Sequence, residues 1–171
     1  MCAYSEALLI AEELEVLLVE RRGQSVRGPH FRIIHRFNPA NGAPCGPGEE
    51  VAAVYLVWRG REFQLRLSTV LRLLFDYLAR HSRLFQSARQ IECGMRESRF
   101  YARISDGSLW STIPRAYVRV YIERVRAAIQ QACEEAGLLL ASDAVLVSEQ
   151  TVMNEIGYRL NATVDWVHSA F

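Results

Sequence analysis

The chain has 171 residues, and 50% of them are hydrophobic, which is typical of a globular protein with a core of its own. No apolar run reaches the roughly 18 residues that a membrane span needs. Glu12, Glu13 and Glu15 interrupt the apolar stretch near the start, unlike in a signal peptide. The sequence therefore predicts a cytoplasmic protein with no membrane segment.

The net charge of +1 hides an uneven distribution, in which all 20 basic residues are arginine. Residues 59–126 contain fourteen arginines and six acidic residues, a net charge of +8. The segments on either side, 1–58 and 127–171, carry −2 and −5. A basic block between acidic ends is typical of a surface that binds a polyanion, although a solvated, arginine-rich helix would give the same count.

The sequence lacks the motifs of a metal site, a disulfide framework or a catalytic centre. The four cysteines form no C-x-x-C pair, and His30, His35 and Cys45 do not follow the spacing of zinc ligands. No P-loop, H-E-x-x-H or G-x-S-x-G motif is present. We therefore expect no metal, no cofactor and no enzymatic activity.

Residues 5–22 are predicted to form an amphipathic helix. Ser5 suits its N-cap, and Gly23 follows its last turn. One face is lined by Ile10, Leu14, Leu17 and Leu18. Because so apolar a face needs a partner, residues 1–24 are expected either to dock on their own domain or to mediate dimerisation. Residues 25–171 are expected to form the domain itself.

Strands are expected next, because residues 30–37 and 51–66 are rich in β-branched and aromatic residues with alternating polarity. Arg59 and Gly60 are expected to form a tight turn that divides the second stretch into two strands. Residues 38–50 are rich in proline and glycine and are expected to be a loop. These elements predict a small N-terminal antiparallel sheet.

Three helices are expected in the middle of the chain. The first follows Ser68, and the second, a short one, follows Ser87 after an extended pair of residues. The third covers residues 112–136 after a polar connection, with Pro114 in its first turn and Gly137 at its end. Its buried stripe is predicted to be Val118, Ile122, Val125 and Ile129, with arginines on the other side.

A hairpin is expected at the end of the chain. Val145 and Val147 lead to a turn at residues 153–156. A second strand then starts at Gly157 and alternates apolar and polar residues as far as Trp166.

The order of these elements and three sequence blocks resemble the OmpR/PhoB-type winged-helix DNA-binding domain of bacterial transcription regulators. The first block, YLVWRGREFQLRLSTVLRLLFDYLARHSRLFQSARQI, is similar to the strand pair and first two helices of that family. The second block, YVRVYIERVRAAI, is similar to its recognition helix, and the third, GYRL, is similar to the end of its wing. These blocks span residues 51–160. The resemblance implies an α+β winged helix-turn-helix fold, in which an extra N-terminal helix precedes a small antiparallel sheet, three helices and a C-terminal β-hairpin wing.

The resemblance also implies that the long helix enters the major groove of double-stranded DNA. Arg124 is then the candidate base-reading residue, with Arg119 beside it. Arg126 falls on the family's most recurrent arginine, which usually contacts phosphate. Arg115 and Tyr117 lie at the helix entry, where phosphates pass.

Four further residues complete the implied DNA-binding set. Tyr121 is placed near a base edge or sugar. Ser87 and Arg89 are implied phosphate anchors, because the start of a helix presents free N–H groups. Glu123 stands where the family often carries a basic residue, and its carboxylate accepts from a cytosine amino group but repels phosphate.

The chain departs from the family pattern at the wing and before the first block. The family often has R-G-x-G-Y at the wing tip, whereas Asn154, Glu155 and Ile156 precede Gly157 here, so the minor-groove arginine is missing. Tyr158 is expected to pack the wing against the body. Too few residues precede the first block for a receiver domain, so a standard response regulator is not expected.

Two functions remain open. The first is sequence-specific DNA binding by a stand-alone transcriptional regulator, acting as a homodimer on repeated half-sites. The second is a winged-helix module that contacts a protein partner in a larger assembly. The near-neutral total charge, Glu123 and the arginine-poor wing favour the second function.

Overall fold

Two β-sheets and a cluster of helices form the part of the chain that the computed structural model describes, which is residues 29–37, 49–97, 113–151 and 154–169. The helix expected over residues 5–22 lies outside these ranges. Most of the expected loop 38–50 lies outside them too. No helix within the described ranges is long and apolar enough to cross a bilayer.

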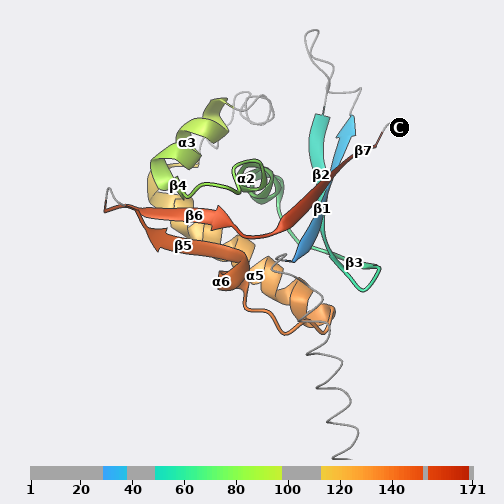
Figure 1. Cartoon of the computed structure of the whole chain (residues 1–171). Helices are drawn as coiled ribbons and strands as arrows, with labels where there is room; N and C mark the ends of the chain where they lie inside the picture. Colours follow the sequence, from blue (N-terminus) through green and yellow to red (C-terminus); the bar gives the residue numbers. More distant parts are fainter. Residues whose placement is uncertain (1–28, 38–48, 98–112, 152–153, 170–171) are drawn as a thin grey trace, which may run out of the picture.

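The larger sheet has four strands in the order β3-β2-β1-β7 (Figure 1). The four strands are β1 (His30–Phe37), β2 (Glu49–Trp58), β3 (Arg61–Gln64) and β7 (Thr163–Ser169). The first three pair antiparallel, as predicted, but β7 pairs with β1 in parallel. The sheet is therefore mixed, and the prediction of a purely antiparallel N-terminal sheet is wrong.

The turn between β2 and β3 is the one that the sequence predicts. Arg59 and Gly60 both have positive φ, 49° and 72°, which is the backbone of a tight two-residue hairpin turn. Strand β2 begins at Glu49, so residues 49 and 50, which were expected in the loop, belong to the strand.

Three longer helices pack against one another: α2 (Thr69–Arg80), α3 (Ala88–Glu97) and α5 (Val118–Glu135). Figure 1 shows α2 nearly end-on between the two sheets. Leu74, Phe75 and Leu78 of α2 are almost completely buried. This central helix therefore forms the middle of the core. Its buried residues cover more than one face of the helix.

The long helix starts later than the sequence predicts. A short 3-10 helix, η2 (Arg115–Tyr117), leads into α5. Pro114 has ψ 139° and precedes this turn, and its carbonyl accepts a hydrogen bond from the Tyr117 N–H at 2.7 Å. Pro114 is thus the cap of the helical segment, and the prediction that it lies in the first turn is wrong. Residue 112, where the helix was predicted to start, lies outside the described ranges.

The smaller sheet contains the expected hairpin and has the order β4-β6-β5. Its strands are β4 (Gln86–Ser87), β5 (Leu146–Gln150) and β6 (Ile156–Leu160), all antiparallel. A single helical turn, α6 (Ser142–Val145), precedes β5 and was not predicted. Gly157 lies where a Cβ would come within 2.9 Å of Phe85 Cβ and Thr151 Cγ2, so only glycine fits without displacing them.

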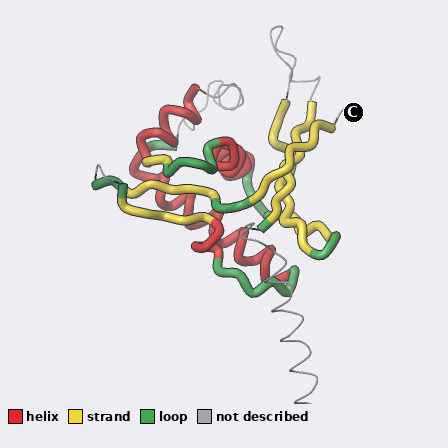
Figure 2. The backbone as a smooth tube through the Cα atoms, in the orientation of Figure 1, coloured by secondary structure: helices red, strands yellow, loops and turns green. Residues whose placement is uncertain are grey.

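The second strand of the hairpin does not continue to Trp166 as predicted. It ends at Leu160, where the Asn161 N–H donates to the Val145 carbonyl at 2.7 Å. The Thr163 N–H then donates to the Pro29 carbonyl at 3.0 Å, and the chain continues as β7 in the other sheet. Figure 2 shows this passage from one sheet to the other through a short loop.

Candidate nucleic-acid interface

Helix α5 has the two-sided character that the sequence predicts. The predicted stripe of Val118, Ile122, Val125 and Ile129 is completely buried. The exposed side carries Arg119, Val120, Glu123, Arg124 and Ala127. Burial of the stripe against the core fixes which side of the helix faces solvent.

The end of α5 is also fixed by local sequence. Gly137 has φ +67°, and its N–H donates to the Glu134 carbonyl at 3.1 Å. The Leu138 N–H donates to the Cys133 carbonyl at 2.8 Å. This pair of hydrogen bonds is a Schellman cap, so the predicted helix end at Gly137 is confirmed.

Arg119 and Arg124 lie on the exposed side of α5. The Arg124 guanidinium lies 5.7 Å from the ring centre of Tyr121, which is half-buried against the core. Within the described ranges, no hydrogen bond or ion pair holds Arg119, although its charge acts on the hydroxyl of Tyr158. Both guanidinium groups are therefore accessible to a ligand.

Arg126 has a different environment, because the protein itself binds its guanidinium group. Its Nε and Nη2 donate to the Leu146 carbonyl at 2.9 and 2.6 Å, and Nη2 also donates to Ser148 Oγ at 3.2 Å. Its Nη1 forms an ion pair with Glu123 at 2.9 Å, and its side chain is only 14% exposed. Arg126 therefore joins α5 to the first strand of the hairpin.

Arg115 and Tyr117 lie in η2, at the start of the helix, and both are exposed. Arg115 Nη2 forms an ion pair with Glu155 Oε1 at 2.8 Å. Glu155 belongs to the hairpin turn, where its carbonyl accepts from the Thr151 N–H at 2.7 Å. The sequence did not indicate this contact, which joins the turn to the helix entry.

Ser87 and Arg89 lie at the start of α3, an element that contacts η2. Ser87 Oγ accepts from the Gln90 N–H at 3.3 Å, and Gln90 Oε1 accepts from the Ser87 N–H at 2.8 Å. This reciprocal pair is a capping box. The predicted cap is therefore confirmed, but Ser87 is buried and its hydroxyl is already engaged, whereas Arg89 is exposed.

Tyr158 packs against the body, as expected, and is 5% exposed. Burial raises the pKa of its hydroxyl, and the charge of Glu123 acts in the same direction. The guanidinium groups of Arg119 and Arg126 partly offset this shift by lowering the pKa. The second strand of the hairpin thus meets α5 through an uncharged tyrosine next to two cations.

A buried polar cluster lies on the other side of the molecule, between α2 and the larger sheet. Asp76 Oδ1 accepts from Trp166 Nε1 at 2.9 Å and from His35 Nε2 at 3.2 Å, and Oδ2 accepts from Arg80 Nε at 2.9 Å. Burial acts to raise the pKa of Asp76, but the hydrogen bonds from His35, Arg80 and Trp166 outweigh it and hold the pKa below its usual value. This cluster fastens β7 to the body.

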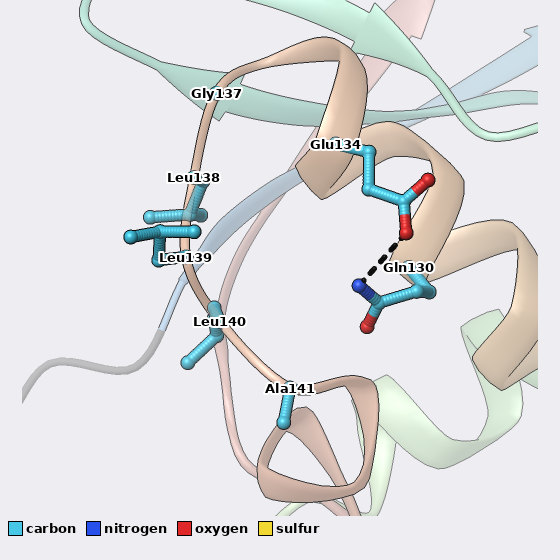
Figure 3. A pocket seen from close by; sticks show the side chains of 7 residues that line it. All are labelled: Gln130, Glu134, Gly137, Leu138, Leu139, Leu140 and Ala141. Atoms are coloured by element: carbon cyan, nitrogen blue, oxygen red, sulfur yellow. Dashed lines mark hydrogen bonds between the residues drawn. The ribbon is translucent and has the colours of Figure 1, made fainter.

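A shallow pocket lies at the C-terminal end of α5 (Figure 3). It is lined by Gln130, Glu134, Gly137, Leu138, Leu139, Leu140 and Ala141. Leu139 is fully exposed, and Gln130 Nε2 donates to Glu134 Oε1 at 3.1 Å. No group of histidine, cysteine and acidic side chains within the described ranges is arranged to hold a metal ion.

The exposed sequence-predicted residues thus lie along η2, α5 and the start of α3, whereas Ser87 and Arg126 are engaged within the protein. Comparisons of the chain with models of protein families, with curated proteins and with solved structures found no match.

Proposed function

We propose that this protein binds double-stranded DNA sequence-specifically through a winged helix-turn-helix domain and regulates transcription. On this proposal α2, α3 and α5 are the three helices of the motif, and the β5–β6 hairpin is its wing. Helix α5 enters the major groove, where Arg124 and Arg119 reach base edges. Arg115, Tyr117 and Arg89 contact phosphates around it.

The observation that carries this proposal is the exposure of Arg119 and Arg124 on a helix whose opposite side is completely buried. Arginine is suited to this role because its planar guanidinium forms two parallel hydrogen bonds with guanine. Arg126 supports the interface indirectly, since it holds the hairpin beside α5. Arg119 and Arg124 therefore present two positive charges on the exposed side of a helix that is packed firmly against the core.

The proposal is tested with a fluorescent random-sequence duplex and anisotropy measurements at about 50 and 200 mM salt, a range over which phosphate-dependent binding weakens strongly. Replacing Arg119 and Arg124 together by alanine is expected to weaken binding by at least about tenfold. The matched control replaces Arg61 and Arg66 together by alanine, two exposed arginines in and just after β3. Equal losses in both variants would indicate a general charge effect and contradict the proposed interface.

Sequence preference is tested by selecting bound duplexes from a random pool. A recovered motif with two half-sites about 10 to 11 base pairs apart would support a dimer on repeated sites. Recovery of unenriched sequences would reject sequence-specific binding even if the chain binds DNA.

A second candidate function, contact with a protein partner, is favoured by one observation. Leu139 is 100% exposed between Leu138 and Leu140, which pack against the core. On this alternative, Leu139→Ser weakens assembly with the partner but leaves DNA binding unchanged. Analytical ultracentrifugation of the full chain and of the variant tests whether that partner is a second copy.

A further inference from the structure

The turn of the β5–β6 hairpin holds a carboxylate against the entry of α5. Thr151 donates its N–H and its hydroxyl to the Glu155 carbonyl, at 2.7 and 3.0 Å. The Asn154 N–H donates to the Thr151 carbonyl at 2.9 Å. These bonds fix the backbone of Glu155, and its Oε1 lies 2.8 Å from Arg115 Nη2.

The Glu155 carboxylate occupies a position that a phosphate oxygen could otherwise take. Carboxylates and phosphates are both recognised by the paired N–H donors of a guanidinium group. A given edge of the Arg115 guanidinium binds only one of them at a time. A phosphate approaching Arg115 must therefore either displace Glu155 or stay close to its negative charge.

Displacement of Glu155 has a low energetic cost, because the ion pair is open to solvent. The side chains of Arg115 and Glu155 are 58% and 37% exposed. Exposed ion pairs contribute little to stability, and salt weakens them. Arg126 differs, since its three donor nitrogens are all engaged and its side chain is 14% exposed.

We infer that Glu155 is an internal competitor for the phosphate site of Arg115 and lowers the affinity of the protein for every DNA sequence. This inference rests on the proposed DNA binding. Because the competition involves a phosphate and not a base, the penalty is independent of sequence. Binding then depends more strongly on the contacts that α5 makes with bases, and the protein leaves non-matching DNA sooner.

The test compares Glu155→Gln with wild type on a random duplex at about 50 mM salt. Removing the competing charge is expected to tighten binding by about three- to tenfold and to steepen the salt dependence. Glu149→Gln is the matched control, because Glu149 is an exposed acid of the same hairpin that lies on β5 outside the turn. Its effect is expected to be less than about twofold.

Arg115→Ala is then combined with Glu155→Gln to complete a double-mutant cycle. The gain from Glu155→Gln is expected to fall below about twofold when Arg115 is absent, because the phosphate site is then missing. Melting temperatures within about 2 °C of wild type will establish that the variants remain folded.

A gain that persists without Arg115, or equal gains for Glu155→Gln and Glu149→Gln, would overturn this inference while leaving DNA binding intact. Weaker binding by Glu155→Gln would also overturn it, because it would mean that Glu155 positions Arg115 for phosphate. Failure of wild type and all variants to bind duplex would reject the proposed function together with this inference.

Discussion

Asp76 and Glu155 make nearly the same contact with arginine in two very different environments. Asp76 lies 2.9 Å from Arg80, and Glu155 lies 2.8 Å from Arg115. The Asp76 side chain is 5% exposed and the Glu155 side chain is 37% exposed. Asp76 also accepts hydrogen bonds from His35 and Trp166. The distance between the charges therefore does not distinguish the roles of the two pairs. Their burial and the number of other hydrogen-bond donors do.

The difference lies in what replaces each contact when it breaks. Water cannot easily reach Asp76, so a lost partner leaves buried polar groups unsatisfied, at a large cost. Solvent and salt ions reach Glu155, so its partner can be exchanged at little cost. The first pair is thus suited to holding the fold together, and the second to a contact that forms and breaks as a ligand binds.

The largest effect is expected for Asp76→Ala, which removes the acceptor shared by α2, β1 and β7. We expect a loss of about 3 kcal/mol in the free energy of unfolding, because the buried His35, and Trp166 in a partly buried hydrogen bond, lose an acceptor that lies in the interior. Urea denaturation measures this loss. Asp165→Ala is the control, since Asp165 pairs with His30 but its side chain is 53% exposed. Similar losses in the two variants would remove the distinction between buried and exposed pairs.

Acid pH provides a second test of the buried pair. In the folded state the pKa of Asp76 lies below its usual value, because the hydrogen bonds from His35, Arg80 and Trp166 outweigh the effect of burial. An unfolded chain therefore takes up a proton at this site before the folded chain does. The stabilisation from Asp76 is fully present above about pH 4 and is lost as the pH falls through the folded pKa.

In Asp76→Asn the side chain at this position is uncharged at every pH, so it takes up no proton in acid. The difference in stability between wild type and Asp76→Asn is therefore expected to shrink below about pH 4, in denaturation curves measured at successive pH values. A difference that stays constant into strong acid would contradict the role assigned to the ionised carboxylate.

An intermediate effect is expected for Arg126, which is mostly buried but lies near the surface. Arg126→Met keeps much of the aliphatic packing and removes the donors to the Leu146 carbonyl, so we expect a loss of about 1–3 kcal/mol in unfolding free energy. Arg124→Met is the control, because Arg124 lies on the exposed side of the same helix. It is expected to change the free energy of unfolding by less than about 0.5 kcal/mol. Equal changes would show that Arg126 does not hold the hairpin.

The smallest effect on stability is expected for Glu155→Gln. Loss of an exposed ion pair is expected to cost less than about 0.5 kcal/mol in thermal denaturation. A loss comparable to that of Asp76→Ala would mean that the turn depends on this pair, and would argue against its exchange with a ligand.

Sequence reasoning succeeded where a structural signal is local. The Arg59-Gly60 turn, the helix cap at Ser87 and the Gly137 helix end each depend on hydrogen bonds within a few residues. The buried stripe of α5 was predicted because its apolar residues recur at helical spacing within one continuous segment.

Sequence reasoning failed where distant segments decide the outcome. Strand β7 pairs with β1, although most of the described chain separates them in sequence. An alternation of apolar and polar residues predicts a strand but not the strand with which it pairs. The binding of Arg126 to the Leu146 carbonyl depends on where the hairpin packs, and this carbonyl is a backbone group with no signature in the sequence. The family resemblance assigned Arg126 to phosphate without this information.

The parallel pairing of β1 with β7 also has a consequence during translation. Strand β1 leaves the ribosome long before β7, so the edge of β1 that β7 will cover stays unpaired until residues 163–169 have been made. Until Trp166 emerges, the Asp76 carboxylate lacks one of its three donors. The nascent chain must therefore protect an exposed strand edge and an incompletely paired acid until β7 emerges, an interval in which a chaperone would be most useful.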